Sequence, residues 1–218
     1  SAAYPEGPGL NIPVNMSVAF HSDAGCHPTD KLVGTFMFYT IKDDDQQTTY
    51  PSGGDRICNR DFADYLQTQI VEDIRQTMMP TWQKRHLMHK SMSETRNPKV
   101  PSTIIELLSH HNYYDMTFGL DPKFKFIVSR AIYKGMLRFI HQTTGTPYVV
   151  QPLPVQQMNI SYANNDSLHI SWAERVDRLE PTATPTYYII YTRTSQLKDG
   201  QWQTSDWNNG IRVTTPHA

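Results

Sequence analysis

An imidazole and a carboxylate each stand at the end of a short run of apolar and β-branched residues. His21 follows Val18-Ala19-Phe20, and Glu106 follows Thr103-Ile104-Ile105. In an open sheet of parallel strands, polar residues at the carboxyl ends of neighbouring strands converge on one crevice. We therefore predict that His21 and Glu106 are neighbours in space and act as a metal ligand and a general base.

Glu106 is the better supported of these two residues. Its apolar neighbours Ile105 and Leu107 would desolvate the carboxylate, which raises its pKa unless a cation, a metal or a hydrogen-bond network pairs with it. A raised pKa suits a general acid or base. The alternative for Glu106 is a structural ion pair with Arg96 or Lys99, and the alternative for His21 is a hydrogen-bonded structural histidine.

Two further residues are candidates for substrate binding. Arg96 is expected to bind a carboxylate, because a guanidinium matches that group in a bidentate manner. His110 and His111 follow the Glu106 strand, and in a strand-like backbone adjacent side chains point to opposite sides. At most one of them, which we take to be His110, would then face the crevice. A structural ion pair for Arg96 and a surface loop for His110 stay open as alternatives.

The pattern of apolar residues predicts an α/β domain over residues 1–145. Asn59–Thr77 has the apolar spacing of an amphipathic helix, and Asp121-Pro122 is typical of a helix start. We expect that second helix to end near His141. Strands are predicted at Val14–Phe20 and Val33–Ile41, with a third running into Glu106. This order indicates a mostly parallel sheet flanked by helices.

Beyond this domain the pattern changes. Residues 146–154 are rich in proline and predict a linker. Residues 155–218 show no helical period, and instead carry short alternating runs at Met158–Tyr162, Leu168–Trp172 and Tyr187–Thr192. The second unit is therefore expected to be an all-β sandwich.

Composition excludes several classes of partner. The formal net charge of -1, from 20 basic and 21 acidic residues, removes the electrostatic case for nucleic acid or an anionic membrane. We expect no transmembrane segment, because no apolar run approaches the roughly 20 residues that span a bilayer. The start of the chain does not have the pattern of a signal peptide. Cys26 and Cys58 leave a disulfide open.

The elements around His21 and Glu106 resemble those of zinc-dependent N-acetylmuramoyl-L-alanine amidases. The motif Val18-Ala19-Phe20-His21-Ser22-Asp23-Ala24 is similar to the element that supplies a zinc-binding histidine in that family, and Val100–Leu107 is similar to the element that ends in its catalytic glutamate. Asn112 falls near an asparagine of the family, which implies substrate binding. The resemblance covers about residues 14–141, and it implies zinc as cofactor and peptidoglycan as substrate.

A closer similarity is to proteins of Bacteroidetes labelled xanthan-lyase-like or golvesin-associated, which attach β modules behind such an amidase-like domain. Trp172 and the tyrosine-rich run Tyr188–Tyr191 resemble the corresponding strands of a fibronectin type III domain. The resemblance implies an exported protein, located in the periplasm, at the cell surface or outside the cell.

The sequence also departs from these families. The amidases take two further zinc ligands, a histidine and a glutamate, from elements that precede the His21 strand, so His21 alone predicts weak or absent zinc binding in this chain. The β unit is shorter than the roughly 100 residues of a seven-stranded sandwich. We therefore expect both domains to be incomplete, and we expect their bare apolar edges to favour a homodimer.

The hypothesis that follows is hydrolysis of a cell-wall amide. Zinc would polarise the carbonyl and activate water, and Glu106 would carry the proton of that water to the leaving amine. One alternative is a non-catalytic cell-envelope protein that binds glycan or peptide on the same scaffold. Another is a peptidase or deacetylase that uses the same groups on a different amide.

Overall fold

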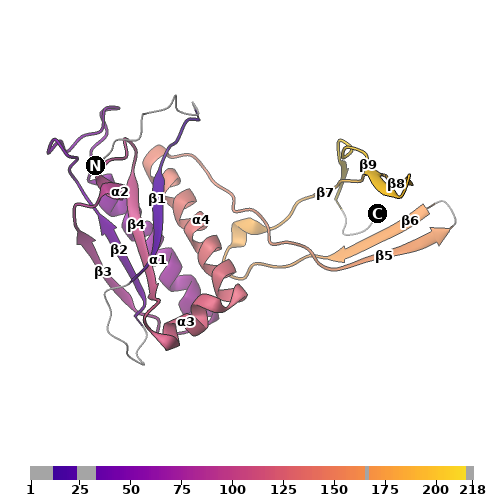
Figure 1. The fold of residues 1–218 in the computed structure, drawn as a ribbon, viewed down its shortest axis with the longest axis horizontal. Coiled ribbons are helices and arrows are strands. Elements are labelled where there is room, and N and C mark those ends of the chain that lie inside the picture. Colours follow the sequence, from indigo (N-terminus) through magenta and orange to yellow (C-terminus); the bar gives the residue numbers. More distant parts are fainter. Residues whose placement is uncertain (1–11, 24–32, 165–166, 215–218) are drawn as a thin grey trace. The chain divides into compact units, whose positions relative to one another are not determined.

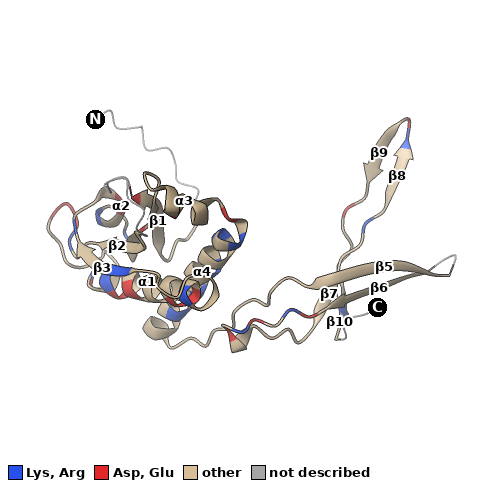
Figure 2. Cartoon of the chain, turned by 90° about the horizontal axis from the view of Figure 1, so that it is seen from below, with Lys and Arg blue, Asp and Glu red and all other residues tan. Residues whose placement is uncertain are grey.

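The chain forms two compact units. This computed structural model describes residues 12–23, 33–164 and 167–214, and the protein divides into Ser1–Tyr148 (unit 1) and Val149–Ala218 (unit 2) (Figure 1). Basic and acidic residues are distributed over both units (Figure 2). The two site residues predicted from the sequence, His21 and Glu106, both belong to unit 1.

Unit 1 is built on a four-stranded sheet with the strand order β1-β4-β2-β3 (Figure 1). The strands are β1 (Ser17–Asp23), β2 (Thr35–Tyr39), β3 (Lys84–His89) and β4 (Ser102–Ser109). β1 runs parallel to β4 and β2 runs parallel to β3, but β2 and β4 are antiparallel. The sheet is therefore mixed, and β1 and β4 are the parallel neighbours on which the site depends.

Two long helices, α1 (Cys58–Thr77) and α4 (Pro122–Thr144), pack side by side against one face of this sheet (Figure 1). The core between these layers includes Met37, Phe62 and Ile105, none of which is exposed. Two shorter helices, α2 (Ser93–Arg96) and α3 (Tyr113–Leu120), flank β4. The helix-covered face takes the alternate apolar residues of the strands, which leaves the intervening residues, including Glu106, on the opposite face.

The start of α4 agrees with the sequence signal, and its end lies beyond the predicted one. The Asp121 side chain accepts a hydrogen bond from the backbone N–H of Lys123 (2.8 Å), and Pro122 occupies the first turn. The helix continues past His141 to Thr144. It ends at Gly145, whose φ of 70° is the left-handed conformation that glycine adopts without strain.

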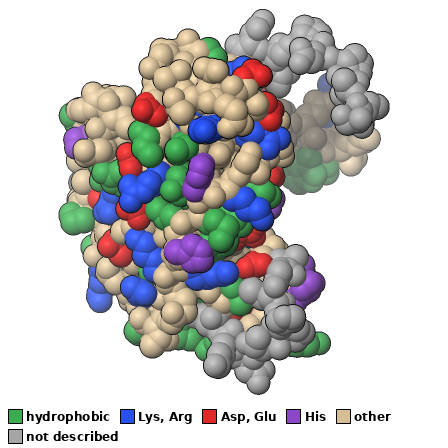
Figure 3. Space-filling model, turned by 90° about the vertical axis from the view of Figure 1, so that its left-hand side faces the viewer, with side chains coloured by type: hydrophobic (Ala, Val, Ile, Leu, Met, Phe, Trp, Pro, Cys, Tyr) green, Lys and Arg blue, Asp and Glu red, His purple; other side chains and the backbone are tan. Residues whose placement is uncertain are grey.

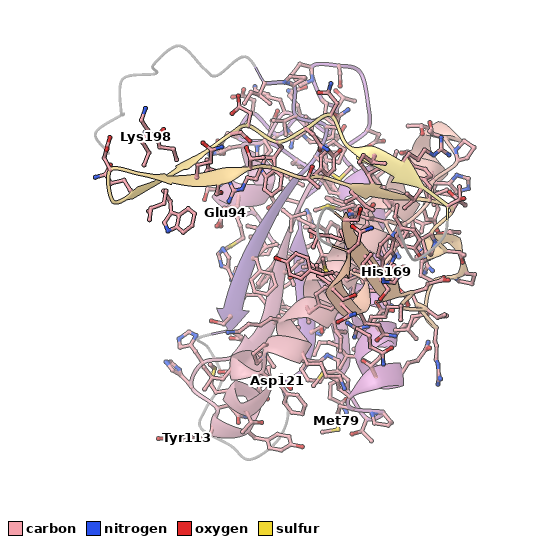
Figure 4. The ribbon with its side chains drawn as sticks, turned by 90° about the vertical axis from the view of Figure 1, so that its right-hand side faces the viewer. Met79, Glu94, Tyr113, Asp121, His169 and Lys198 are labelled. Atoms are coloured by element: carbon pink, nitrogen blue, oxygen red, sulfur yellow. The ribbon has the colours of Figure 1, made fainter. Side chains whose placement is uncertain are left out.

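Three elements of unit 1 were not predicted from the sequence. β3 lies in a stretch that is recognisable only as basic, because an edge strand exposes alternate charged side chains and shows little apolar periodicity. α2 and α3 are too short for a periodic signal. The start of α3 is set by Asn112, whose side chain accepts hydrogen bonds from the backbone N–H groups of Tyr114 and Asp115. Tyr113, in the first turn, is 94% exposed and projects from the protein (Figure 4).

One glycine is required for the close approach of β2 and β3. Gly34 has φ +86°, and a Cβ built on it would lie 2.3 Å from the carbonyl oxygen of Gln83. The neighbouring backbone N–H of Thr35 donates to that same oxygen (3.0 Å). Any side chain at position 34 would therefore push the two strands apart where they begin to pair.

The described part of unit 2 consists of three separate two-stranded antiparallel sheets. The pairs are β5 (Gln156–Asn164) with β6 (Ser167–Ala173), β7 (Tyr188–Ile190) with β10 (Ile211–Val213), and β8 (Ser195–Lys198) with β9 (Gln201–Thr204). A short 3₁₀ helix, η1 (Pro181–Ala183), precedes β7. The unit has no α-helix among its described residues. The fibronectin type III assignment stays a prediction, because the pairs do not join into two packed sheets.

Cys58 carries a free thiol at the start of α1, and burial raises the pKa of that thiol. Cys26 lies outside the described residues.

None of the described helices is both long and apolar enough to span a bilayer.

A buried ion pair joins the two long helices and generates a first prediction. Lys134 Nζ of α4 lies 2.7 Å from Asp73 Oδ2 of α1, with both side chains almost fully buried. Replacing Lys134 with methionine removes the cation that faces this buried carboxylate, and we expect a loss of about 3–5 kcal/mol in the free energy of unfolding. Urea unfolding, monitored by the circular dichroism signal of the helices, measures the free energy of unfolding of unit 1, because α1 and α4 belong to that unit.

Two controls accompany this variant. Adding Asp73→Asn to Lys134→Met should recover most of the loss, because the neutral amide can still accept the hydrogen bond from Gln69 (2.8 Å in the native protein). Lys84→Met breaks the exposed pair with Asp64 and should cost less than about 1 kcal/mol. Equal costs for Lys134→Met and Lys84→Met would contradict the role assigned to the buried pair.

Candidate functional site

His21 and Glu106 occupy paired positions on β1 and β4. They are register partners in the parallel ladder, and His21 Nδ1 lies 3.7 Å from Glu106 Oε1. The side chain of His21 is 38% exposed and that of Glu106 is 13% exposed. The prediction that these two residues are neighbours is confirmed. Their chemical roles stay predictions.

Glu94 was not predicted as a site residue, and it completes the surroundings of His21. The short helix α2 carries Glu94, whose Oε1 lies 2.8 Å from His21 Nε2 (Glu94 is labelled in Figure 4). The imidazole therefore lies between two carboxylates, one at each ring nitrogen. A four-residue helix in a polar stretch gives no periodic signal, so the sequence offered nothing that would single out Glu94.

A second ion pair lies at the carboxyl end of β1. Arg85 Nη1 lies 2.9 Å from Asp23 Oδ2, although β3 and β1 are opposite edges of the sheet. The guanidinium reaches across the strands between them and lies over the ring of Phe36, 4.5 Å from its centre. Because Phe36 is the register partner of Glu106, this arginine passes close to the Glu106 carboxylate.

Burial raises the pKa of Glu106 above that of an exposed glutamate. Desolvation is the largest cause, the charge on His21 opposes it, and Asp23 and Glu94 raise the pKa while Arg85 lowers it. Glu106 Oε2 is buried and has no hydrogen-bond partner among the described residues. Because burial disfavours the charged form, this carboxyl group keeps its proton to a higher pH than an exposed glutamate. A pKa closer to the working pH suits a group that both takes up and returns a proton.

Arg96 makes its polar contacts away from His21 and Glu106. It forms an ion pair with Asp44 and donates a hydrogen bond from Nη1 to Ser91 Oγ (3.0 Å). The ion-pair partner of Glu106 is His21, so the alternative of a structural pair between Glu106 and Arg96 is wrong. The substrate-binding role of Arg96 stays a prediction.

The two adjacent histidines do not point to opposite sides, and that expectation is wrong. Residues 110 and 111 form a turn after β4 rather than a continuation of the strand. Their rings meet edge to face with centres 4.4 Å apart. His110 Nδ1 lies 2.8 Å from the hydroxyl oxygen of Ser22 on β1, so His110 lies beside the strand that carries His21.

Asn112 is fully buried, and its side chain caps the start of α3. The neighbouring carboxylate of Asp115 accepts backbone hydrogen bonds from Ser109 (2.8 Å) and Val33 (3.1 Å), which ties the helix to the strand ends. Burial raises the pKa of Asp115. These contacts give Asn112 a structural role, and its substrate-binding role stays a prediction.

The described residues do not fit a zinc site with three protein ligands. In the ranges 12–23, 33–164 and 167–214, no three His, Cys, Asp or Glu side chains are arranged so that they could hold a metal ion. Both nitrogens of His21 face carboxylates at distances typical of ion pairing. The arrangement is suited to proton transfer and to attraction of a cationic group.

The surroundings of the site are mixed in character. Figure 3 shows the β3 side of unit 1, where histidine, acidic and basic side chains lie among apolar ones. Two ion-paired groups lie here: His21 with Glu94 and Glu106, and Arg85 with Asp23. We call these five residues the carboxylate network, because Asp23 and Arg85 also influence the pKa of Glu106.

No family model matches the chain, and no curated protein matches it. Among solved structures, the N-acetylmuramoyl-L-alanine amidase AmiC2 of Nostoc punctiforme is similar with a TM-score of 0.45 and 16% identity, covering 58% of each chain. The N-acetylmuramoyl-L-alanine amidase of Clostridium difficile 630 has a TM-score of 0.46 and 15% identity, covering 61% of this chain and 60% of that one.

The CwlD amidase of Clostridioides difficile, solved with the GerS lipoprotein, has a TM-score of 0.45 and 19% identity, covering 61% of this chain and 57% of the other. The chain thus spans about 60% of the length of these structures.

The raised pKa of Glu106 predicts a pH dependence of stability. In the unfolded chain the Glu106 carboxyl group ionises at the ordinary glutamate pKa, whereas in the folded protein it ionises only at a higher pH. The wild-type protein should therefore lose stability relative to Glu106→Gln as the pH rises from the ordinary glutamate pKa through the raised one. Urea unfolding of both proteins across that pH window measures the difference.

Glu72→Gln, on an exposed part of α1, controls for the loss of a carboxylate as such. A relative stability of wild type and Glu106→Gln that did not change with pH, or that changed in the opposite direction, would contradict the raised pKa.

Proposed function

We propose that unit 1 contributes the acid/base group of an amide hydrolase that acts on an amide bond of the cell wall, as the N-acetylmuramoyl-L-alanine amidases do. The observation that carries this proposal is the position of Glu106: a partly buried carboxyl group with a raised pKa, opposite His21 on the neighbouring parallel strand. The resemblance of the motifs around these two residues to the amidase elements supports the choice of an amide as the substrate bond.

In the proposed mechanism Glu106 moves one proton from an oxygen atom to a nitrogen atom of the reactants. As the carboxylate it accepts a proton from the attacking water, and as the acid it returns that proton to the leaving amine nitrogen. His21, held between Glu94 and Glu106, favours the carboxylate form of Glu106 from which the first step starts and orients that carboxylate. Asp23 and Arg85 set the local charge without contacting the substrate in this scheme.

Several further parts of the proposal rest on the motif resemblance. They are an amidase-like domain over residues 1–145, a fibronectin type III-like module over 155–218, an exported location and peptidoglycan as the substrate. Zinc also remains part of this proposal. It would polarise the carbonyl if ligands beyond His21 completed a site, but the described residues alone do not supply them.

A second candidate function is binding of cell-wall glycan or peptide without catalysis. The observation that favours it is the lack of three convergent metal ligands among the described residues. A binding protein would use the carboxylate network only to recognise its ligand. Its affinity for glycan or peptide would therefore not depend on whether Glu106 can transfer a proton. Cleavage and binding measured on the same samples separate the two functions.

The hydrolase proposal predicts that Glu106→Gln, which keeps the shape of the side chain, lowers the rate of amide cleavage by a factor of about 10² to 10⁴. The measurement is the release of new amino groups from purified peptidoglycan by the full chain, with Zn²⁺ supplied. Binding to insoluble peptidoglycan is measured on the same samples by co-sedimentation.

Glu72→Gln is the matched control and should keep the wild-type rate. Equal cleavage by wild type and Glu106→Gln would contradict the assignment of Glu106. Binding without any cleavage by the wild-type protein would reject the hydrolase and support the binding function.

A further inference from the structure

Unit 2 presents an uncharged apolar face on the β5–β6 hairpin. Apolar side chains alternate along both strands, and the cross-strand partners Ile160 with Ile170 and Tyr162 with Leu168 lie on the same face. Neither strand contains Lys, Arg, Asp or Glu, as the tan colour of both strands in Figure 2 shows. A sheet with one apolar face is stable only when that face is buried against another layer.

A groove of about 560 Å³ runs between this face and the β7 region. Met158, Ile160 and Leu168 line it from the hairpin, and Tyr191 and Trp207 line it from the other side. All five of these side chains are more than half exposed. The two layers therefore face each other across an unfilled space instead of forming a closed core. We call this set, together with Tyr162 and Ile189, the hairpin groove.

The exposed apolar area of the hairpin groove is large enough for a specific dimer. Tyr162, Tyr191 and Trp207 are 83%, 54% and 57% exposed, and Met158, Ile160, Leu168 and Ile189 are 62%, 55%, 56% and 45% exposed. With the usual burial areas of such side chains, this amounts to roughly 600 Å² per copy. Two copies would bury about 1,200 Å², which is the lower end of the range for specific interfaces.

The side chains that line the groove favour an apolar partner surface, and a second copy of this chain offers one. Among the described residues that line the groove, Arg193 is the one charged side chain, and its guanidinium already lies over the Trp207 ring, 4.6 Å from the ring centre. A glycan or a charged peptide would need hydrogen-bonding groups, whereas most of the lining is aliphatic or aromatic. A twofold dimer brings identical patches together, so an uncharged patch is complementary to itself.

We propose that the hairpin groove is the contact surface of a twofold-symmetric homodimer, in which the β5–β6 face of each copy closes the groove of its partner. The dimer buries the apolar face that a single copy leaves in water. Its affinity is expected to be in the micromolar range, because the area is at the low end for specific interfaces.

The test is analytical ultracentrifugation of the full chain over a concentration series. Wild-type protein should pass from monomer to dimer below about 100 μM. Tyr162→Asp places a charge at the most exposed position of the groove, and Ile160→Asp places one near its centre. Each should weaken dimerisation at least about tenfold, because a charge would be buried without a partner. Tyr162 is so exposed that its replacement should leave folding intact, which circular dichroism verifies.

Ser161→Asp is the matched control, because Ser161 lies between these two residues on the same strand but on the opposite face. It should dimerise like the wild type. Wild-type protein that stays monomeric throughout the series would overturn the proposal. So would a dimer that Tyr162→Asp and Ser161→Asp leave equally stable, because it would then form through another surface.

Discussion

The parallel pairing of β1 with β4 is the constraint on which the candidate site depends. It places His21 opposite Glu106 on the face of the sheet that α1 and α4 do not cover. Side chains alternate along a strand, so a shift of one residue would turn Glu106 into the apolar core and bring Ile105 or Leu107 to the site. The buried position of both apolar neighbours fixes the register, and the register fixes the geometry of the carboxyl group.

Around that pair, the sheet gathers charges from segments that are far apart in the chain. Glu94 arrives on a four-residue helix, and Arg85 reaches over Phe36 from the opposite edge strand to meet Asp23. The result is a carboxyl group whose pKa is raised by burial and by two neighbouring carboxylates, and lowered by an imidazole and a guanidinium. Such a balance of opposing effects is what an acid/base group requires, which is why the function is proposed at this place.

The sequence predicted the elements that carry strong periodicity or strong end signals. Helix α1 has regular apolar spacing, α4 has an Asp-Pro start, and the β-branched run before Glu106 identifies β4. The prediction that His21 and Glu106 are neighbours rested on the expected parallel pairing of their strands, which is correct, although both residues lie within the strands and not at their ends. Glu94 and Arg85 could not be predicted, because their positions depend on tertiary contacts of a short helix and an edge strand. The orientation of His110 and His111 could not be predicted either, because the two residues form a turn in which their rings meet, and not the strand-like backbone that was assumed for them.

The most direct test of the central claim is the titration of Glu106 with and without His21, followed by carbon-detected NMR of the glutamate carboxyl groups. The charge on His21 lowers the pKa of Glu106, so His21→Asn should raise the pKa of Glu106 further. His169→Asn, in unit 2, controls for the loss of a histidine. An unchanged Glu106 pKa in His21→Asn would mean that the two side chains do not face each other, and it would contradict the site described for this protein.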